Sequence, residues 1–106
     1  MTNEKNRFCK SPDCCNMKGM LQFLIMFILS KEPMNGSQIA DEIGRRRGDK
    51  PTPGTIYPAL KELSKKHIIN STEEGKQKIY SLTDLGKEGL VECKAWFKQV
   101  FGDILQ

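Results

Sequence analysis

Apolar residues divide this chain into four stretches that predict helices and two short runs that predict strands. The first predicted helix, Met17 to Ser30, is apolar on almost every face, and Pro33 prevents it from continuing beyond Glu32. A helix that is apolar all round is either enclosed in a large core or shared with another chain. Because 106 residues leave little room for a large core, we expect this helix to contact a partner.

The second predicted helix, Gly36 to Arg46, follows a choice of capping residues. Either Asn35 or Ser37 can cap its first turn, since both side chains carry an oxygen that accepts a hydrogen bond from a free backbone N–H. Its inward stripe is formed by Ile39, Ala40 and Ile43.

The third predicted helix, Pro53 to Lys66, begins with two start signals. We expect Thr52 to cap it, and Pro53 occupies the first helical position, where a missing N–H costs nothing. Pro58 is the weak point of this assignment, because a proline inside a helix removes a hydrogen bond and kinks the axis. The buried face is formed by Ile56, Leu60 and Leu63.

Two extended runs, His67 to Thr72 and Gln77 to Leu82, are joined by a loop at 73–76 that contains glycine, and they predict a β-hairpin. Thr83 then caps a long last helix. Apolar residues recur on that helix at intervals of three and four, which is typical of a seam between packed helices. The seam is formed by Leu90, Cys93, Phe97, Val100 and Ile104, with Trp96 and Phe101 beside it.

This order of elements predicts a mainly α fold with a small β-hairpin: a winged helix-turn-helix plus a long C-terminal dimerisation helix. We divide the chain into a cysteine-containing N-terminal arm (1–16), a DNA-binding domain (17–82) and the dimerisation helix (83–106). In such a fold the third helix enters the major groove and the hairpin lies along the neighbouring backbone of the DNA.

Positive charge is concentrated in the part of the chain that this fold would bring to DNA. The net charge is +4, and residues 44–66 hold seven lysines and arginines against two acidic residues. Residues 83–106 hold three against four, so phosphates would attract only the first region. The run Arg45–Arg47 has two interpretations: a contact to the DNA backbone, or a favourable end for its helix at the negative pole of the helix dipole.

We expect neither a membrane protein nor an enzyme. The apolar run from Met20 to Leu29 is shorter than the roughly 20 residues that span a bilayer, and no signal-peptide cleavage site follows it, so a cytoplasmic protein is expected. His67 is the single histidine and has no obvious carboxylate partner in the sequence, and nucleotide-binding glycine patterns are absent. This interpretation requires no cofactor.

Three motifs of the chain resemble the PadR-like family of transcriptional regulators. They are Pro53–Leu63 with its Tyr-Pro pair, Tyr80–Lys87 after the hairpin, and Pro33–Gly36 before the second helix. The resemblance covers roughly residues 17–90 and implies a dimer joined through the first and last helices, repression of nearby genes and, in some members, an effector at the dimer interface. The chain departs from the pattern at Ser37, where a tyrosine is common, and at His67, where a glycine usually ends the third helix.

Double-stranded DNA is therefore the predicted partner. Thr55 and Tyr57 are best placed for base edges, while Lys61 and Lys65 suit phosphates, for which a flexible point charge is enough. The Tyr57 ring could instead pack against the hairpin and leave only its hydroxyl for DNA. The alternative for the lysines is an ordinary solvated surface. The predicted contacts are Thr52, Gly54, Thr55, Tyr57, Lys61, Lys65, Lys76 and Lys78.

The second predicted partner is another copy of the chain. The predicted homodimer interface consists of Leu21, Leu24, Ile28, Leu90, Trp96, Phe97, Val100 and Ile104. Trp96 has two interpretations, since a lone tryptophan on such a helix either packs in the interface or lines a pocket for a small aromatic effector.

Four cysteines leave a metal site open as an alternative. Cys9, Cys14, Cys15 and Cys93 supply the thiolate count of a tetrahedral zinc site, but the Cys-x2-Cys spacing typical of such sites is missing. The other interpretation is reduced cysteines, with Cys93 filling the seam as a small apolar side chain.

The sequence thus favours a sequence-specific DNA-binding transcriptional regulator, a repressor, that acts as a homodimer. Two alternatives stay open. One is a metal- or thiol-redox-responsive regulator that uses the N-terminal cysteines, and the other is a winged-helix protein-interaction module that binds no DNA.

Overall fold

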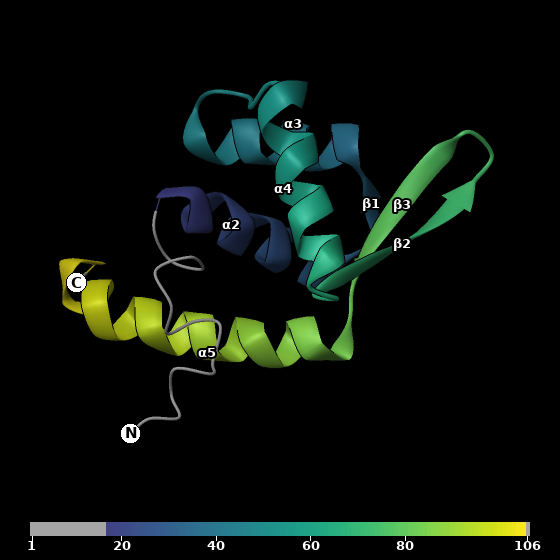
Figure 1. Ribbon diagram of the computed structural model, residues 1–106. Helices are drawn as coiled ribbons and strands as arrows, with labels where there is room; N and C mark the ends of the chain where they lie inside the picture. The colour runs from purple at the N-terminus through teal and green to yellow at the C-terminus, as the bar shows by residue number, and fades with distance from the viewer. Residues whose placement is uncertain (1–16, 106) are drawn as a thin grey trace.

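The computed structural model describes residues 17–105, and this part of the chain forms four α-helices, three strands and a final 3-10 turn. The elements are α2 (Met17–Lys31), β1 (Met34–Asn35), α3 (Gly36–Arg47), α4 (Pro53–Lys65), β2 (Ile69–Glu74), β3 (Gln77–Leu82), α5 (Asp84–Phe101) and η3 (Gly102–Leu105). In Figure 1, α2 lies between α5 on one side and α3 and α4 on the other, and the hairpin β2–β3 projects from the helices as a wing. The predicted winged helix-turn-helix is confirmed, and the bounds of α2, α3 and α4 agree within one residue.

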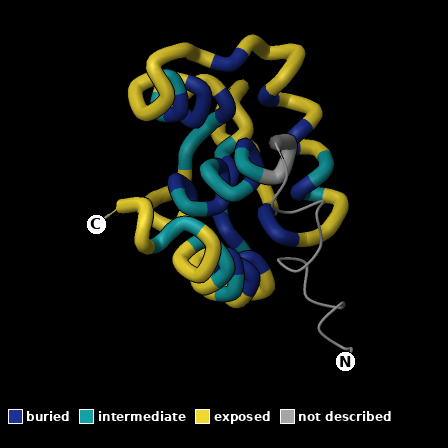
Figure 2. Tube along the Cα trace, turned by 90° about the vertical axis from the view of Figure 1, so that its left-hand side faces the viewer, coloured by how far each residue is buried: buried dark blue, intermediate teal, exposed yellow. Residues whose placement is uncertain are grey.

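Helix α2 is the centre of the hydrophobic core. It contacts α3, α4, α5 and β3, and the side chains of Ile25, Met26 and Ile28 are at most 1% exposed. Figure 2 shows buried residues gathered where these helices face one another. Most of the apolar surface of α2 is therefore covered within one chain, so a smaller part of this helix is left to contact a partner chain than the sequence predicts. Within residues 17–105, no helix is both long and apolar enough to cross a bilayer.

The helix starts show which predicted caps form. The Asn35 side chain accepts a hydrogen bond from the Gln38 amide (2.8 Å), and the Gln38 side chain accepts one from the Asn35 amide (3.0 Å), so a complete capping box starts α3. The prediction for Thr52 is wrong in one respect. Its backbone carbonyl begins α4, but its side chain makes no capping bond and lies 3.3 Å from the Thr55 hydroxyl, oxygen to oxygen.

The sheet differs from the predicted hairpin in two ways. A two-residue strand, β1, pairs antiparallel with β3 and places Met34 opposite Tyr80, which gives the order β1-β3-β2. The predicted loop at 73–76 is also too long, since Glu74 pairs with Gln77 and only two residues form the turn. Gly75, with φ of 64°, supplies the positive φ that such a tight turn needs at its first position.

Strand β2 starts at Ile69 and not at His67, the predicted start, because the end of α4 includes His67. His67 does not begin the strand but adopts a left-handed conformation with φ of 62°. Its amide donates to the Ser64 carbonyl, and the Ile68 amide donates to the Leu63 carbonyl (3.0 Å each), which closes the helix. The PadR-like sequences that this chain resembles usually have a glycine at this position. Residue 67 keeps the left-handed conformation that favours glycine although it is a histidine.

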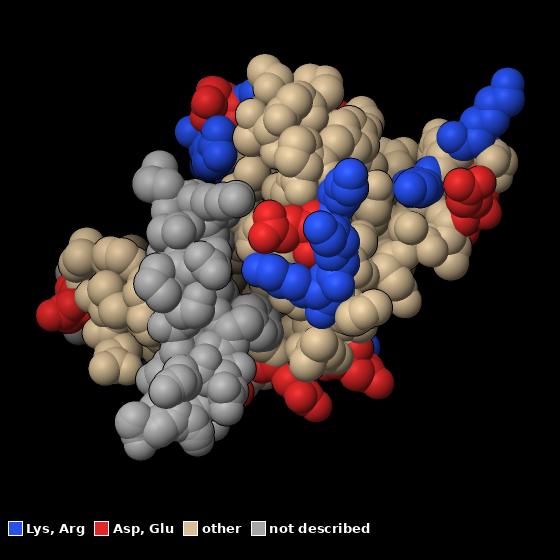
Figure 3. Space-filling view, viewed as in Figure 1, with Lys and Arg blue, Asp and Glu red and all other residues tan. Residues whose placement is uncertain are grey.

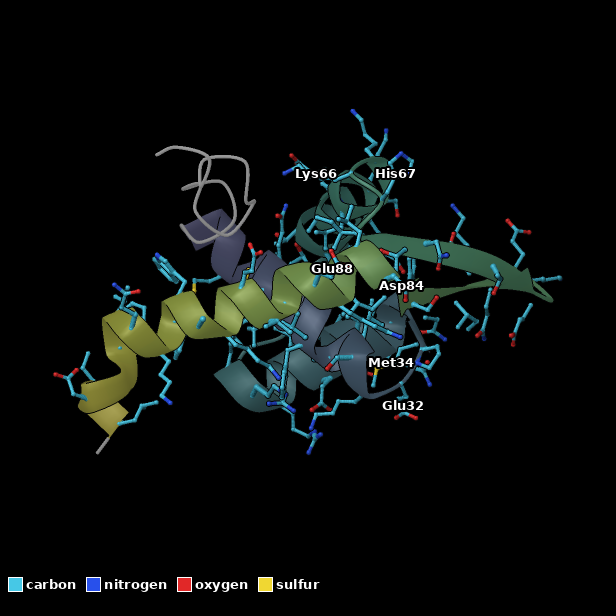
Figure 4. The ribbon with its side chains drawn as sticks, turned by 90° about the horizontal axis from the view of Figure 1, so that it is seen from below. Glu32, Met34, Lys66, His67, Asp84 and Glu88 are labelled. Atoms are coloured by element: carbon cyan, nitrogen blue, oxygen red, sulfur yellow. The ribbon has the colours of Figure 1, made fainter. Side chains whose placement is uncertain are left out.

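One backbone carbonyl, that of Ile68, joins the end of α4 to the start of α5. It accepts a hydrogen bond from the Thr83 amide (3.0 Å). The single proton of the Thr83 hydroxyl is shared between the His67 carbonyl (2.7 Å) and the Ile68 carbonyl (2.9 Å), and the same hydroxyl accepts a hydrogen bond from the Gly86 amide (3.0 Å). A Cβ on Gly86 would lie 2.3 Å from this carbonyl oxygen. Figure 4 labels His67 at the end of α4 and Asp84 at the start of α5, the two segments that meet at this junction. The predicted cap at Thr83 is confirmed, and it also fixes the α5 axis against the wing.

We predict that Gly86→Ala destabilises the protein by about 3 kcal/mol, the upper end of the cost of overpacking, because the Ile68 carbonyl belongs to the backbone and cannot move aside. Urea unfolding followed by circular dichroism measures the change. Gly54→Ala is the matched control, since its Cβ would meet only the Thr52 hydroxyl, at 3.9 Å. Equal midpoints for the two variants would contradict this account of the junction.

Candidate nucleic-acid interface

Helix α4 has one buried and one exposed face. Ile56, Leu60 and Leu63 are at most 1% exposed and fix the helix to the core. The opposite face is open, and all eight residues predicted to contact DNA are exposed. Because Pro58 has no N–H, the carbonyl of the exposed Gly54 has no i+4 donor within the helix. The start of α4 therefore presents the Thr55 hydroxyl at an exposed position.

The lysines of α4 and of the wing carry charge that is not neutralised locally. Within residues 17–105, Lys61, Lys65, Lys76 and Lys78 form no ion pair. Figure 3 shows lysine and arginine side chains over α4 and at the wing, with acidic side chains beside both groups and others below them along the start of α5. On the wing, Glu73 lies opposite Lys78 in the sheet register. This face therefore carries charges of both signs, with four lysines that form no ion pair within residues 17–105.

The arginine run at the end of α3 behaves differently. Arg45 and Arg46 bind the Glu42 carboxylate, Arg46 at 3.0 Å, and Arg47 lies 3.3 Å from the Asp49 carboxylate. The hydrogen bond from the Arg45 guanidinium lowers the pKa of the Glu42 carboxyl below its usual value, so the pair is charged at neutral pH. These contacts favour the second interpretation of the run, a charged helix end whose partners are already in the chain.

The Tyr57 ring lies against the first turn of α3. A Cβ on Gly36 would be 2.7 Å from its Cε1 and 2.8 Å from its hydroxyl oxygen, so glycine at position 36 allows the approach. The Tyr57 side chain is nevertheless 47% exposed. The ring therefore packs on α3 rather than standing free, and its hydroxyl is held near the start of that helix, which favours a backbone contact over a base contact.

The wing is tied to α3 by a side-chain hydrogen bond. The Asn35 amide group donates to the Gln77 side-chain oxygen (2.9 Å), in addition to the capping bond that Asn35 accepts. Between the first turn of α3, Tyr57 and the wing lies a hollow of about 570 Å³. Its wing side is lined by Glu73, Lys76, Gln77, Lys78 and Tyr80.

The predicted dimer surface is divided by the fold. Leu21, Ile28 and Leu90 are at most 8% exposed and belong to the core of the single chain. Leu24, Trp96 and Phe97 are half-buried, and the Phe97 ring packs on Phe23 and Phe101 with centroids 5.7 and 4.9 Å apart. Val100 and Ile104 are 45% and 70% exposed. The seam thus begins inside the core and continues beyond it as an open apolar strip.

The cysteine set is mostly outside the described residues, since it includes Cys9, Cys14 and Cys15. Cys93 is 1% exposed and disulfide-bonded. Across residues 17–105 no group of three or more His, Cys, Asp or Glu side chains could hold a metal ion. A disulfide-bonded Cys93 is neither a reduced cysteine nor a thiolate ligand, so in this structure it belongs to no zinc site. Zinc binding by Cys9, Cys14 and Cys15 stays a prediction.

Sequence reasoning missed four residues of this face: Gly36, Asn35 as a tether of the wing, Gln77 and Tyr80. Gly36 follows a capping residue in the sequence, but only the approach of Tyr57 shows why it is a glycine. Tyr80 alternates with half-buried positions like any core strand residue, so its pattern gives no sign that it lines a hollow.

Comparison with known proteins agrees with the geometry. Residues 25–92 match the transcriptional regulator PadR-like family. A PadR-like transcriptional regulator of Bacillus cereus is 30% identical, with a TM-score of 0.75 over 85% of this chain and 95% of that one. A PadR family transcription regulator of Clostridium difficile is 32% identical, with a TM-score of 0.70 over 83% and 100%.

A curated relative, the transcriptional activator GvpE of Haloferax mediterranei, is 30% identical over 63 residues, or 59% of this chain. The chain spans only about a third of the length of that activator. The family match covers most of the described residues and includes α3, α4 and the wing. The chain belongs to the PadR-like family of transcriptional regulators, which is not a family of enzymes.

Proposed function

We propose that the protein is a sequence-specific DNA-binding regulator that acts as a two-fold homodimer. The observation that carries the proposal is the exposed face of α4, whose lysines form no ion pair within residues 17–105 and lie on the same side of the molecule as those of the wing. A surface lysine is usually only solvated, but a positive face on the third helix of a winged helix-turn-helix is where DNA binds in this fold.

Each part of the face has a different role in the proposal. Thr55 and the exposed backbone at Gly54, at the start of α4, contact base edges. Lys61 and Lys65 contact phosphates beside the groove, and the wing lysines contact the neighbouring backbone. The packing of Tyr57 on Gly36 assigns its hydroxyl to the backbone rather than to a base.

The open strip on α5 supports the dimer. Leu90 and Cys93 complete the core, whereas Val100 and Ile104 continue the same seam with exposed side chains. A second chain that packs its own α5 and α2 there would bury this strip and the half-buried aromatic side chains beside it. Trp96, in edge contact with Phe101 at 6.1 Å, is placed to line an aromatic effector pocket in such a dimer.

Repression is the proposed direction of regulation, because a dimer bound to an operator blocks polymerase access by occupancy alone. We place the protein in the cytoplasm, where bacterial and archaeal DNA is accessible.

DNA binding predicts two different losses. Thr55→Val removes a hydroxyl but keeps the shape, and should weaken binding to the preferred duplex by about 1–3 kcal/mol for each half-site while leaving random DNA unaffected. Lys78→Ala should weaken both duplexes by the same factor and lower the salt slope by about one unit per charge. Fluorescence anisotropy across a salt series measures both.

Lys98→Ala on α5 is the control for charge, since its side chain is exposed but belongs to another helix. It should change neither quantity. A wild-type protein that binds no duplex would reject the DNA-binding proposal and favour a protein-interaction module. The same conclusion would follow if no substitution in α4 or the wing lowered the affinity for DNA.

The dimer is tested by a matched pair on α5. Val100 and Val91 are both exposed (45% and 67%) and lie nine residues apart, which places them on opposite faces of the helix. Val100→Asp should convert the dimer to monomer in light scattering, because it buries a charge in the seam, while Val91→Asp should leave a dimer. Phe97 is less suitable, since it also packs within the chain. A wild-type protein that is a folded monomer would exclude the dimer.

A further inference from the structure

The hollow between α3, Tyr57 and the wing contains a polar group that the fold does not use. Tyr80, on β3, has a side chain that is only 8% exposed and lines the hollow. Among the described residues none forms a hydrogen bond with its hydroxyl. In this part of the chain no side-chain nitrogen or oxygen is both fully buried and without a partner, so the Tyr80 hydroxyl keeps some accessible surface, on a side chain that lines the hollow.

The surroundings of this hydroxyl favour an anion. Lys76 and Lys78 approach from the wing, and the first turn of α3 contributes the positive end of a twelve-residue helix. Glu73 is the one acidic residue of the lining, against two lysines. Burial, and to a smaller extent Tyr57, raises the pKa of the Tyr80 hydroxyl, so at neutral pH it keeps its proton and can donate.

The hollow is held open by contacts on two sides. The Asn35–Gln77 hydrogen bond (2.9 Å) fixes the wing to the start of α3, and Gly36 leaves room for the Tyr57 ring. The wing and α3, which form the two sides of the hollow around the Tyr80 hydroxyl, are thus held together before any ligand arrives. This reduces the ordering cost of binding.

We propose that this hollow binds one phosphate of the DNA backbone in each half-site, with the Tyr80 hydroxyl as a buried donor and Lys78 and Lys76 as its charged flank. The inference rests on the proposed DNA binding and adds to it a contact that fixes the register of the wing on the duplex. Tyr80 is then a positioning residue for the protein on DNA as well as a strand residue.

Single methylphosphonate substitutions test the contact, because each replaces one charged phosphate oxygen by a methyl group. The duplex is one selected by the wild-type protein from a random pool. Tyr80→Phe should weaken binding to the unmodified duplex by about tenfold per half-site, the cost of a hydrogen bond to a charged group. At one phosphate in each half-site, the methylphosphonate should cost Tyr80→Phe about tenfold less than it costs the wild type.

Lys61→Ala is the matched control and should show such coupling at a different phosphate, contacted from α4. The urea midpoint of Tyr80→Phe should be unchanged or higher, since the hydroxyl has no partner to lose. A lower midpoint, or equal losses at every phosphate, would overturn the phosphate contact. If Tyr80→Phe binds DNA as tightly as the wild type, the phosphate contact is wrong and the proposed function stands. If the wild type binds no DNA, both the phosphate contact and the proposed function are wrong.

Discussion

The backbone carbonyl of Ile68 is the point on which the arrangement of this molecule depends. Three segments meet there: the end of α4, the end of β3 and the first turn of α5. The Thr83 amide donates to the carbonyl, and the Thr83 hydroxyl is shared between it and the neighbouring His67 carbonyl. The Gly86 backbone comes so close that no side chain fits between it and the Ile68 carbonyl. Because these contacts are made by backbone atoms and one short side chain, they leave little freedom for the angle between α5 and α4. Any dimer built on α5 therefore holds two copies of α4 in a fixed relation.

The same rigidity extends to the wing through α3. Asn35 caps α3, and it also donates to Gln77 of β3, so one residue sets both the start of a helix and the direction of the wing. Tyr57 and Gly36 add the contact between α4 and α3. The three parts that would touch DNA are thus connected to one another by short-range contacts, and the charged residues at the far end of α3 pair among themselves. The lysines of α4 and the wing, in contrast, form no ion pair within residues 17–105.

Local signals in the sequence predicted most of the fold. Helical periodicity, Pro53 at the first position of α4 and Thr83 before α5 gave element bounds close to those observed, because caps and prolines act within a few residues. Strand β1 could not be predicted in this way, since two residues have no periodicity and pair only because β3 is beside them. The division of the α5 seam also depends on tertiary structure: Cys93 and Val100 look equivalent in the sequence, but only the first is buried.

The candidate site could be predicted as a face and not as a set of contacts. Exposure of the eight predicted residues follows from the buried stripe of α4 and from the hairpin, both of which are readable as periodicity. The role of Tyr57 and the orientation of the Tyr80 hydroxyl depend on the approach of segments far apart in the chain, which no local pattern encodes.

In the proposed dimer, α3, α4 and the wing are fixed to α5, and α5 joins the two chains. This arrangement fixes the distance between the two copies of α4. Selection of bound duplexes from a random pool, followed by sequencing, tests it most directly. The account predicts an inverted repeat whose half-sites keep one spacing, with centres one helical turn of about 34 Å apart or a small multiple of it. Enrichment of single half-sites, or of half-sites at many spacings, would contradict it.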